Sequence, residues 1–250
     1  MGRLLQELSE KEAAFIRRQP VIFVATAAAT GRVNVSPRSP GRSLAVLSPR
    51  RCALLDLTGS GSETAAHLTH DGRITVMCVN LEEGPPQILR IHGRGRVLLK
   101  AAVPADTLAH FPPELREGPG FRAVYMIDVE RVTASCGFSM PIMELRSYRA
   151  TLDAFAAKSG AEGMRAYRQL KNGFSVDGLR SVGALEGGAL VPLKRGEAGY
   201  QGGYLLARPA RTWWGRAGWE WPTEWAWGGV AWFAAGAVAC EVAHRMVRRG

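Results

Sequence analysis

The sequence predicts a mainly β protein with flanking helices, in which the strands form a small antiparallel barrel. About six or seven short runs rich in Val, Ile, Leu and Thr follow one another closely between residues 21 and 132. Turn residues such as Gly31 and Asp71-Gly72 separate these runs. Long helical patterns are rare between them, so the strand–helix alternation of a parallel sheet is missing. This combination favours an antiparallel barrel.

Individual elements are expected where periodicity and turn residues agree. Ser9 and Glu12 have the spacing of a capping box and begin the first helix. We expect Pro37 to end the second strand, because proline cannot donate to a ladder. Inside the longest strand, Gly93 and Gly95 predict a bulge or a close backbone approach. The expected strands cover 21–26, 33–36, 43–47, 53–57, 73–79, 88–99 and 123–132, and the expected helices cover 9–18, 62–70, 104–111, 151–158 and 161–170.

Residues 54–68 are predicted to form a strand, a tight turn and the start of a helix. Gly59 and Gly61 allow backbone conformations that are closed to other residues. Ser60 and Glu63 fit a capping box for the helix. Free N–H groups at a helix start, the helix dipole and nearby hydroxyls together bind anions, most often phosphate. The alternative is an ordinary connection whose serines only cap the helix. The hydroxyls belong to Thr58, Ser60, Ser62 and Thr64.

The charge and the cysteines narrow the function classes. The net charge is +10, but the arginines are spread along the chain and no nucleic-acid-binding module accompanies them, so we expect no nucleic-acid partner. The four cysteines lack the spacing of a metal knuckle, and we expect Cys52 and Cys78 to be reduced, buried thiols. His67 is expected to be packed and His70 solvated, so no metal site is predicted.

The C-terminal part has a different composition from the first 185 residues, which we expect to form one domain. Residues 186–224 are rich in Gly and Trp and are expected to be a linker or extension. Residues 225–247 are expected to form an apolar helix flanked by tryptophans and arginines. Two alternatives stay open for this helix, a membrane anchor and a packed or amphipathic helix. Acidic residues near the N-terminus argue against a secretory signal, so we expect a cytoplasmic protein, with or without this anchor.

Five short motifs occur in a fixed order between residues 21 and 138. They are FVATA at 23–27, GRVNVSPR at 31–38, DLTGSGSETAAHL at 56–68, GRITVM at 72–77 and RIHGRG at 90–95. SCGFSMP at 135–141 then follows the pattern of a largely uncharacterised branch. In these motifs the segment resembles the pyridoxamine 5′-phosphate oxidase-like family, whose fold is the FMN-binding split β-barrel.

The resemblance implies a homodimer with two FMN molecules in clefts between the subunits. By position, Arg38 would supply the positive charge for the flavin phosphate. Ser60, Ser62 and Thr64 would donate hydrogen bonds to it, and Glu63 would turn back to cap its own helix. Asn34 and Ser36 would face the isoalloxazine ring or the ribityl chain. Thr58 would lie beneath the ring edge.

The family's pattern is not matched everywhere. True pyridoxamine phosphate oxidases end in an Arg/His-rich motif that grips the substrate, and this chain ends in a tryptophan-rich tail. We therefore expect an FMN-dependent oxidoreductase acting on a different, unidentified small molecule, and assign no catalytic residue. The alternative is a non-catalytic split-barrel protein that binds flavin or another cofactor, such as haem or deazaflavin.

Overall fold

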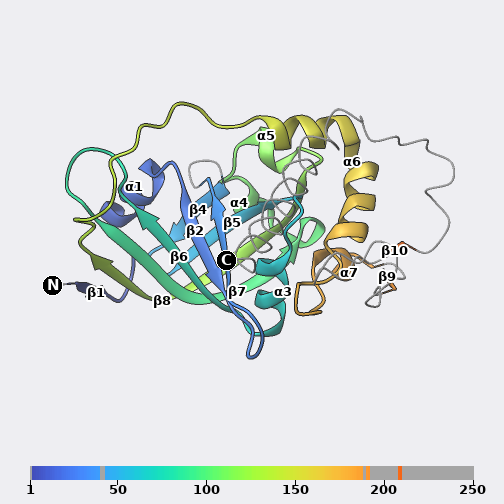
Figure 1. Ribbon diagram of the computed structural model, residues 1–250, viewed down its shortest axis with the longest axis horizontal. Coiled ribbons are helices and arrows are strands. Elements are labelled where there is room, and N and C mark those ends of the chain that lie inside the picture. The colour runs from blue at the N-terminus through green and yellow to red at the C-terminus, as the bar shows by residue number, and fades with distance from the viewer. Residues whose placement is uncertain (1, 40–42, 188–189, 192–207, 210–250) are drawn as a thin grey trace, which may run out of the picture. The chain divides into compact units, whose positions relative to one another are not determined.

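The computed structural model describes residues 2–39, 43–187, 190–191 and 208–209 (Figure 1). Eight strands form one sheet in the order β3-β2-β6-β7-β8-β5-β4, with β1 paired to β8. Every pairing in this sheet is antiparallel, which confirms the predicted mainly β class with flanking helices. The strands are β1 (Arg3–Leu5), β2 (Ile22–Thr26), β3 (Asn34–Arg38), β4 (Leu44–Ser48), β5 (Arg51–Leu57), β6 (Arg73–Val79), β7 (Ile88–Leu99) and β8 (Phe121–Ser135).

Helices and short turns flank the sheet. The first helix carries the predicted capping box between Ser9 and Glu12, and buries Phe15 and Ile16. The helices are α1 (Glu10–Arg18), α3 (Glu63–His70), η1 (Lys100–Ala102), α4 (Ala105–Leu108), α5 (Pro113–Arg116), α6 (Thr151–Lys171) and α7 (Val182–Leu185). The two helices expected after residue 150 are present within α6 and meet at a kink at Gly160, whose φ of 66° departs from the helical region.

The sheet curls around one main core. Ile22 and Val24 from β2 belong to the same buried cluster as Leu44 from β4, although these strands lie near opposite ends of the strand order. A flat sheet would keep them apart, so the shared cluster indicates a barrel-like closure. A second cluster, which includes Leu55 and Val124, covers the other face of β5 and β8 under α5. These two strands are therefore buried on both faces.

Two glycines explain local features of the barrel. The register of β7 against β8 shifts between His92 and Gly93, as predicted. A Cβ at Gly93 would lie 2.1 Å from the carbonyl oxygen of Asp128, so only glycine fits this close approach. A Cβ at Gly95 would press on Leu68, which brings α3 against β7.

The prediction that Pro37 ends the second strand was wrong. Strand β3 continues to Arg38, and Pro37 pairs with Phe23 of β2. The strand lies at one edge of the sheet, where proline's missing N–H deprives no neighbour of a partner. Because the strand continues to Arg38, the side chains of Asn34, Ser36 and Arg38 lie on one face of β3, and Val35 and Pro37 are exposed between them.

The segment 136–150 joins β8 to α6 as an extended stretch without helix or strand (Figure 1). It touches the barrel where the N–H of Met143 donates to the Leu81 carbonyl at 2.6 Å. Further on, β9 (Leu190–Val191) pairs with β10 (Arg208–Pro209). Among the described residues, none of the helices is long and apolar enough to cross a bilayer. The helix predicted over 225–247 lies outside the described residues, so the anchor and its alternative stay predictions.

Candidate functional site

A cavity of about 400 Å³ lies where β3 and β5 end, next to the turn at Gly59–Gly61. Its wall includes Arg38 from β3, Ser60 and Gly61 from the turn, and Tyr148 and Arg149 before α6. Apolar side chains of Leu55, Leu57, Leu115 and Leu152 complete part of the lining. The cavity therefore combines cationic and hydroxyl groups, and the carboxyl groups of Asp56 and Asp153, with an apolar wall, a mixture typical of ligand sites.

Two buried polar atoms in this wall have no hydrogen-bond partner among the described residues. They are Nε of Arg38 and Oγ of Ser39. An unpaired buried donor costs about 1–3 kcal/mol, so such atoms mark places where a ligand or water completes the bonding. A phosphate group would satisfy both, because its oxygens accept hydrogen bonds and its charge suits a guanidinium.

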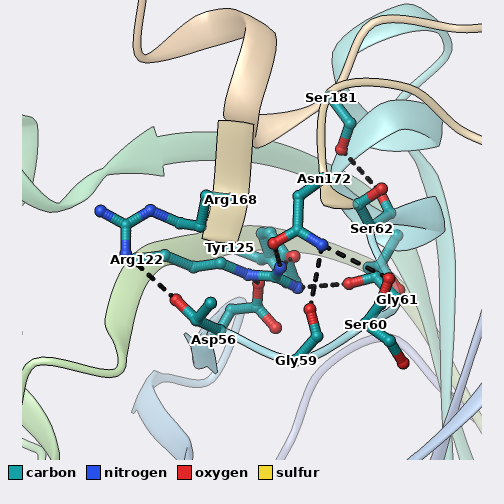
Figure 2. A network of polar contacts seen from close by, with 12 residues as sticks. Asp56, Gly59, Ser60, Gly61, Ser62, Arg122, Tyr125, Arg168, Asn172 and Ser181 are labelled. Atoms are coloured by element: carbon teal, nitrogen blue, oxygen red, sulfur yellow. Dashed lines mark hydrogen bonds and ion pairs between the residues drawn. The ribbon is translucent and has the colours of Figure 1, made fainter. Parts of the chain in front are cut away.

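Beneath the cavity, a buried network fixes β5 against β8 (Figure 2). Asp56 accepts from Nε of Arg122 at 2.5 Å and from Oη of Tyr125 at 2.6 Å. It also accepts from Nη2 of Arg38 at 3.3 Å, which holds the Arg38 side chain at the cavity wall. Burial alone would lower the pKa of Arg122, but Asp56 and Tyr125, with the hydrogen bonds to both, together outweigh burial and raise it. Burial and Asp56 together raise the pKa of Tyr125, so its phenol keeps the proton that it donates.

The carbonyl oxygens of the turn all face this network. Nδ2 of Asn172 donates to the carbonyls of Gly59 at 2.9 Å and Ser60 at 3.4 Å, and Nη2 of Arg122 donates to that of Gly61 at 2.7 Å (Figure 2). In a trans peptide, a carbonyl and the following N–H point in opposite directions. The N–H groups of residues 60–62 therefore point away from the network, and none of them donates to another described residue. Asn172 and Arg122 therefore cover the carbonyl side of the turn, and the N–H side is free of partners among the described residues.

The predicted capping box at the start of α3 was wrong. The N-cap is Ser62, two residues later than Ser60, and its hydroxyl donates to the Phe174 carbonyl at 3.3 Å instead of capping the helix. Glu63 accepts from the N–H of Val176 at 2.9 Å. Burial, with a contribution from Asp177, raises the pKa of Glu63. Ser62 and Glu63 therefore hydrogen-bond to the backbone of the loop 172–181 and do not cap the helix.

The remaining predicted residues divide into two groups. Thr58 is fully buried, and its hydroxyl accepts from Nη1 of Arg168 at 3.2 Å, so it lies inside the fold. Asn34 donates to Oγ1 of Thr64 at 3.2 Å and accepts from Ser36 at 3.0 Å, which makes a polar row along β3. Of the eight predicted residues, Arg38 and Ser60 line the cavity, and Asn34 and Ser36 lie beside Arg38 on the same strand face.

The polar contacts of Asn34 extend through Thr26 to His67, the histidine that was expected to be packed. His67 is buried, with Nδ1 at 3.1 Å from Oγ1 of Thr26, whereas His70 is exposed, as predicted. Cys52 and Cys78 are buried and free, also as predicted, and burial raises the pKa of each to about 12. Within the part of the chain that the structure describes, no group of three metal-binding side chains lies together.

Sequence reasoning missed four residues of the site. Ser39 lies beyond the expected end of its strand, and Asn172 lies far along the chain, just after the helix expected over 161–170. Asp56 did carry a signal, because it is a lone charge inside the apolar run 53–57 and must find a partner there. Arg122 precedes the strand expected over 123–132 and meets Asp56 because β8 lies beside β5, an order that no local pattern contains.

Comparison with known families decides what this barrel is. Residues 8–136, just over half of the chain, match the model of the family described as pyridoxamine 5′-phosphate oxidase. The chain belongs to this family. The match covers the barrel from α1 to the end of β8, including β3, β5 and the turn. Arg168, Asn172 and Ser181, which contact the turn, lie outside it.

A curated relative shares the same family name. The pyridoxamine 5′-phosphate oxidase family protein ustO of Aspergillus flavus is 38% identical over 142 residues. The match covers 56% of this chain and 56% of ustO, so the chain spans about half the length of that relative.

Solved structures also show similarity to this pyridoxamine 5′-phosphate oxidase family member. HupZ of group A Streptococcus is 20% identical with a TM-score of 0.38, covering 50% of this chain and 91% of that one. A FAD-binding protein of Mesorhizobium loti is 15% identical with a TM-score of 0.35, covering 54% and 96%. HutZ of Vibrio cholerae, described as a heme storage protein, is 15% identical with a TM-score of 0.38, covering 52% and 97%. At these TM-scores the similarities carry no argument about function.

Proposed function

We propose that this protein is an FMN-dependent oxidoreductase that acts on a small organic molecule. The observation that carries the proposal is the pair of buried donors Arg38 Nε and Ser39 Oγ, which lie in the cavity beside the turn and have no partner in the described part of the chain. Membership of the pyridoxamine 5′-phosphate oxidase family supports a flavin as the ligand. When bound, the flavin would supply the redox chemistry, and the protein would supply position and charge.

Each part of the site has a role under this proposal. The guanidinium of Arg38 and the N–H groups of residues 60–62 would bind the flavin phosphate, since charge-assisted bonds to phosphate are among the strongest in proteins. Asn34 and Ser36, further along the same face of β3, would face the ribityl chain or the ring. Asp56 would hold Arg38 toward the cavity while Arg122 and Tyr125 satisfy its remaining charge.

We also propose that the protein acts as a homodimer. The extended segment before α6 presents apolar side chains to solvent in the single chain, with Phe138 83% and Ile142 72% exposed. Contiguous exposed apolar side chains mark interaction surfaces. Val33 and Val35, on the opposite face of the edge strand from Asn34 and Ser36, are exposed as well. A second copy covering both apolar regions would bury these side chains.

Reduction of bound flavin tests the enzymatic part of the proposal. The purified full chain is loaded with FMN, NADPH or dithionite is added under nitrogen, and the visible spectrum is followed before and after oxygen is admitted. An oxidoreductase should lose its flavin absorbance with NADPH and regain it with oxygen. Flavin that responds to dithionite but to no biological reductant would instead indicate a binding protein.

A further inference from the structure

We infer that Asn172 is a positioning residue for the flavin phosphate, which it serves by fixing the turn at residues 59–61. The inference rests on the proposed FMN site and concerns a part of the chain outside the family match, which ends at residue 136. Asn172 does not line the cavity, so its effect on the ligand must pass through the turn.

Asn172 and Arg122 control the direction of three successive peptide groups. Between them they bind the carbonyl oxygens of Gly59, Ser60 and Gly61. Each bound carbonyl turns the next N–H to the opposite side. Three N–H donors are therefore aligned on one side of the turn by two side chains on the other. This alignment needs a polar group with donors on the carbonyl side, which a carboxamide and a guanidinium provide.

The carboxamide of Asn172 is itself held from several directions. Its Oδ1 accepts from Nη1 of Arg122 at 2.7 Å, and the side chain is fully buried. Its backbone N–H donates to the Arg168 carbonyl at 2.8 Å, and its own carbonyl accepts from Gly183 at 2.8 Å. A Cβ at Gly183 would lie 2.2 Å from the Arg168 carbonyl oxygen, so α7 packs as closely as glycine allows. The amide is thus fixed before any ligand arrives.

The turn needs this external support because its own sequence is permissive. Gly59 and Gly61 have no side chain to restrict the backbone, and a Cβ at either would meet no atom within 4 Å. An unsupported turn of this kind would have to be ordered by the ligand, which weakens binding. Anchoring it through Asn172 removes that penalty in advance. Ser181, whose hydroxyl donates to the Ser62 carbonyl at 2.7 Å, extends the same support to the start of α3.

The test compares two changes at Asn172 with a matched control. Asn172→Ala removes both the donor and the acceptor, while Asn172→Asp keeps an acceptor for Arg122 and loses the donor to the turn. Gln19→Ala is the control, because Gln19 is also a buried carboxamide that donates to a backbone carbonyl, that of Phe15 at 2.8 Å, in helix α1. FMN affinity of the full chain is measured by flavin fluorescence, with the urea midpoint measured for each variant.

We expect FMN to bind at least tenfold more weakly to Asn172→Ala and Asn172→Asp, and Gln19→Ala to keep wild-type affinity. In the flavin-free protein, a broad-specificity protease should cut residues 57–63 several-fold faster in Asn172→Ala than in Gln19→Ala. Wild-type affinity in both Asn172 variants, or an equal loss in Gln19→Ala, would overturn the inference alone. A wild-type chain that binds no FMN would overturn the proposed function, and the phosphate role of Asn172 with it.

Discussion

The guanidinium of Arg122 and the carboxylate of Asp56 meet at 2.5 Å in the protein interior, where each side chain is only 1% exposed. Arg122 lies on β8 and Asp56 on β5, so the pair joins two strands that are buried on both faces. From this pair one contact leads to Arg38 at the cavity and others lead to the turn and to Asn172. The charge arrangement at the cavity therefore depends on a network buried beneath it.

Asp56→Asn should strongly destabilise the fold. The change leaves the Arg122 guanidinium buried without its counter-charge, and breaking a buried pair in this way costs about 3–5 kcal/mol. Asp128→Asn is the matched control, since Asp128 is 48% exposed and pairs with Arg51 on the surface. Its loss should cost less than about 1 kcal/mol. Urea unfolding, followed by far-UV circular dichroism, measures the free energy of unfolding of both variants. Equal losses of stability would contradict the role given to Asp56.

Arg38→Ala should weaken FMN binding by roughly 1–3 kcal/mol, the scale of a charge-assisted contact. Stability should change little, because Asp56 keeps its contacts with Arg122 and Tyr125. Arg96→Ala is the control, since Arg96 is a half-exposed arginine paired with Asp128 on β8. Titration of FMN fluorescence measures both affinities. Unchanged binding in Arg38→Ala would place the phosphate elsewhere.

Glu63 should make stability depend on pH. Its pKa is raised in the fold, mainly by burial, from an ordinary value of about 4.5. The folded chain therefore holds the proton more tightly than the unfolded chain, and this contribution to stability is present at low pH and lost as pH rises through the raised pKa. Gln at this position keeps an acceptor for the Val176 N–H and does not titrate.

Glu63→Gln should accordingly gain stability over the wild type as pH rises from 4 toward 8. Urea unfolding at a series of pH values measures the difference. Glu7→Gln serves as the control, because Glu7 is 59% exposed and pairs with the exposed Arg50. A difference between Glu63→Gln and wild type that stays constant over this range, or shrinks as pH rises, would count against burial of the Glu63 charge.

Phe138→Asp combined with Ile142→Asp should convert the proposed dimer to monomers. Both side chains are largely exposed in the single chain, and a charge in a buried apolar interface is strongly unfavourable. Leucine at both positions keeps the apolar surface and should preserve the dimer. Sedimentation equilibrium of the two double variants measures the mass of each. A monomeric wild type, or a dimeric Asp variant, would exclude this segment from the interface.

The sequence predicted the barrel better than it predicted the site. Strands such as β6 (Arg73–Val79) and β7 (Ile88–Leu99) were predicted with their observed bounds, because turn residues border their apolar patterns on both sides. Strand β3 continues through Pro37 because it lies at the edge of the sheet. Its edge position follows from the order of the strands, which no local sequence pattern contains. The same limit applies to Asn172, whose partners in the turn, Gly59 and Ser60, lie more than 110 residues away in the chain.

Position along the chain identified Arg38 and Ser60, which do line the cavity, but not the contacts that occupy Thr58, Ser62 and Glu63. Those contacts come from residues 168–176, which fold back over the turn. A hydroxyl or carboxylate near a helix start satisfies a cap, a ligand or a distant backbone group equally well. Only the three-dimensional arrangement separates these possibilities.

The most direct test of the account is the visible spectrum of the purified full chain during titration with FMN. The account predicts a protein that binds one FMN per chain, with flavin fluorescence quenched on binding and affinity reduced in Arg38→Ala but not in Arg96→Ala. A folded, colourless protein that stays colourless and leaves FMN fluorescence unchanged would contradict it.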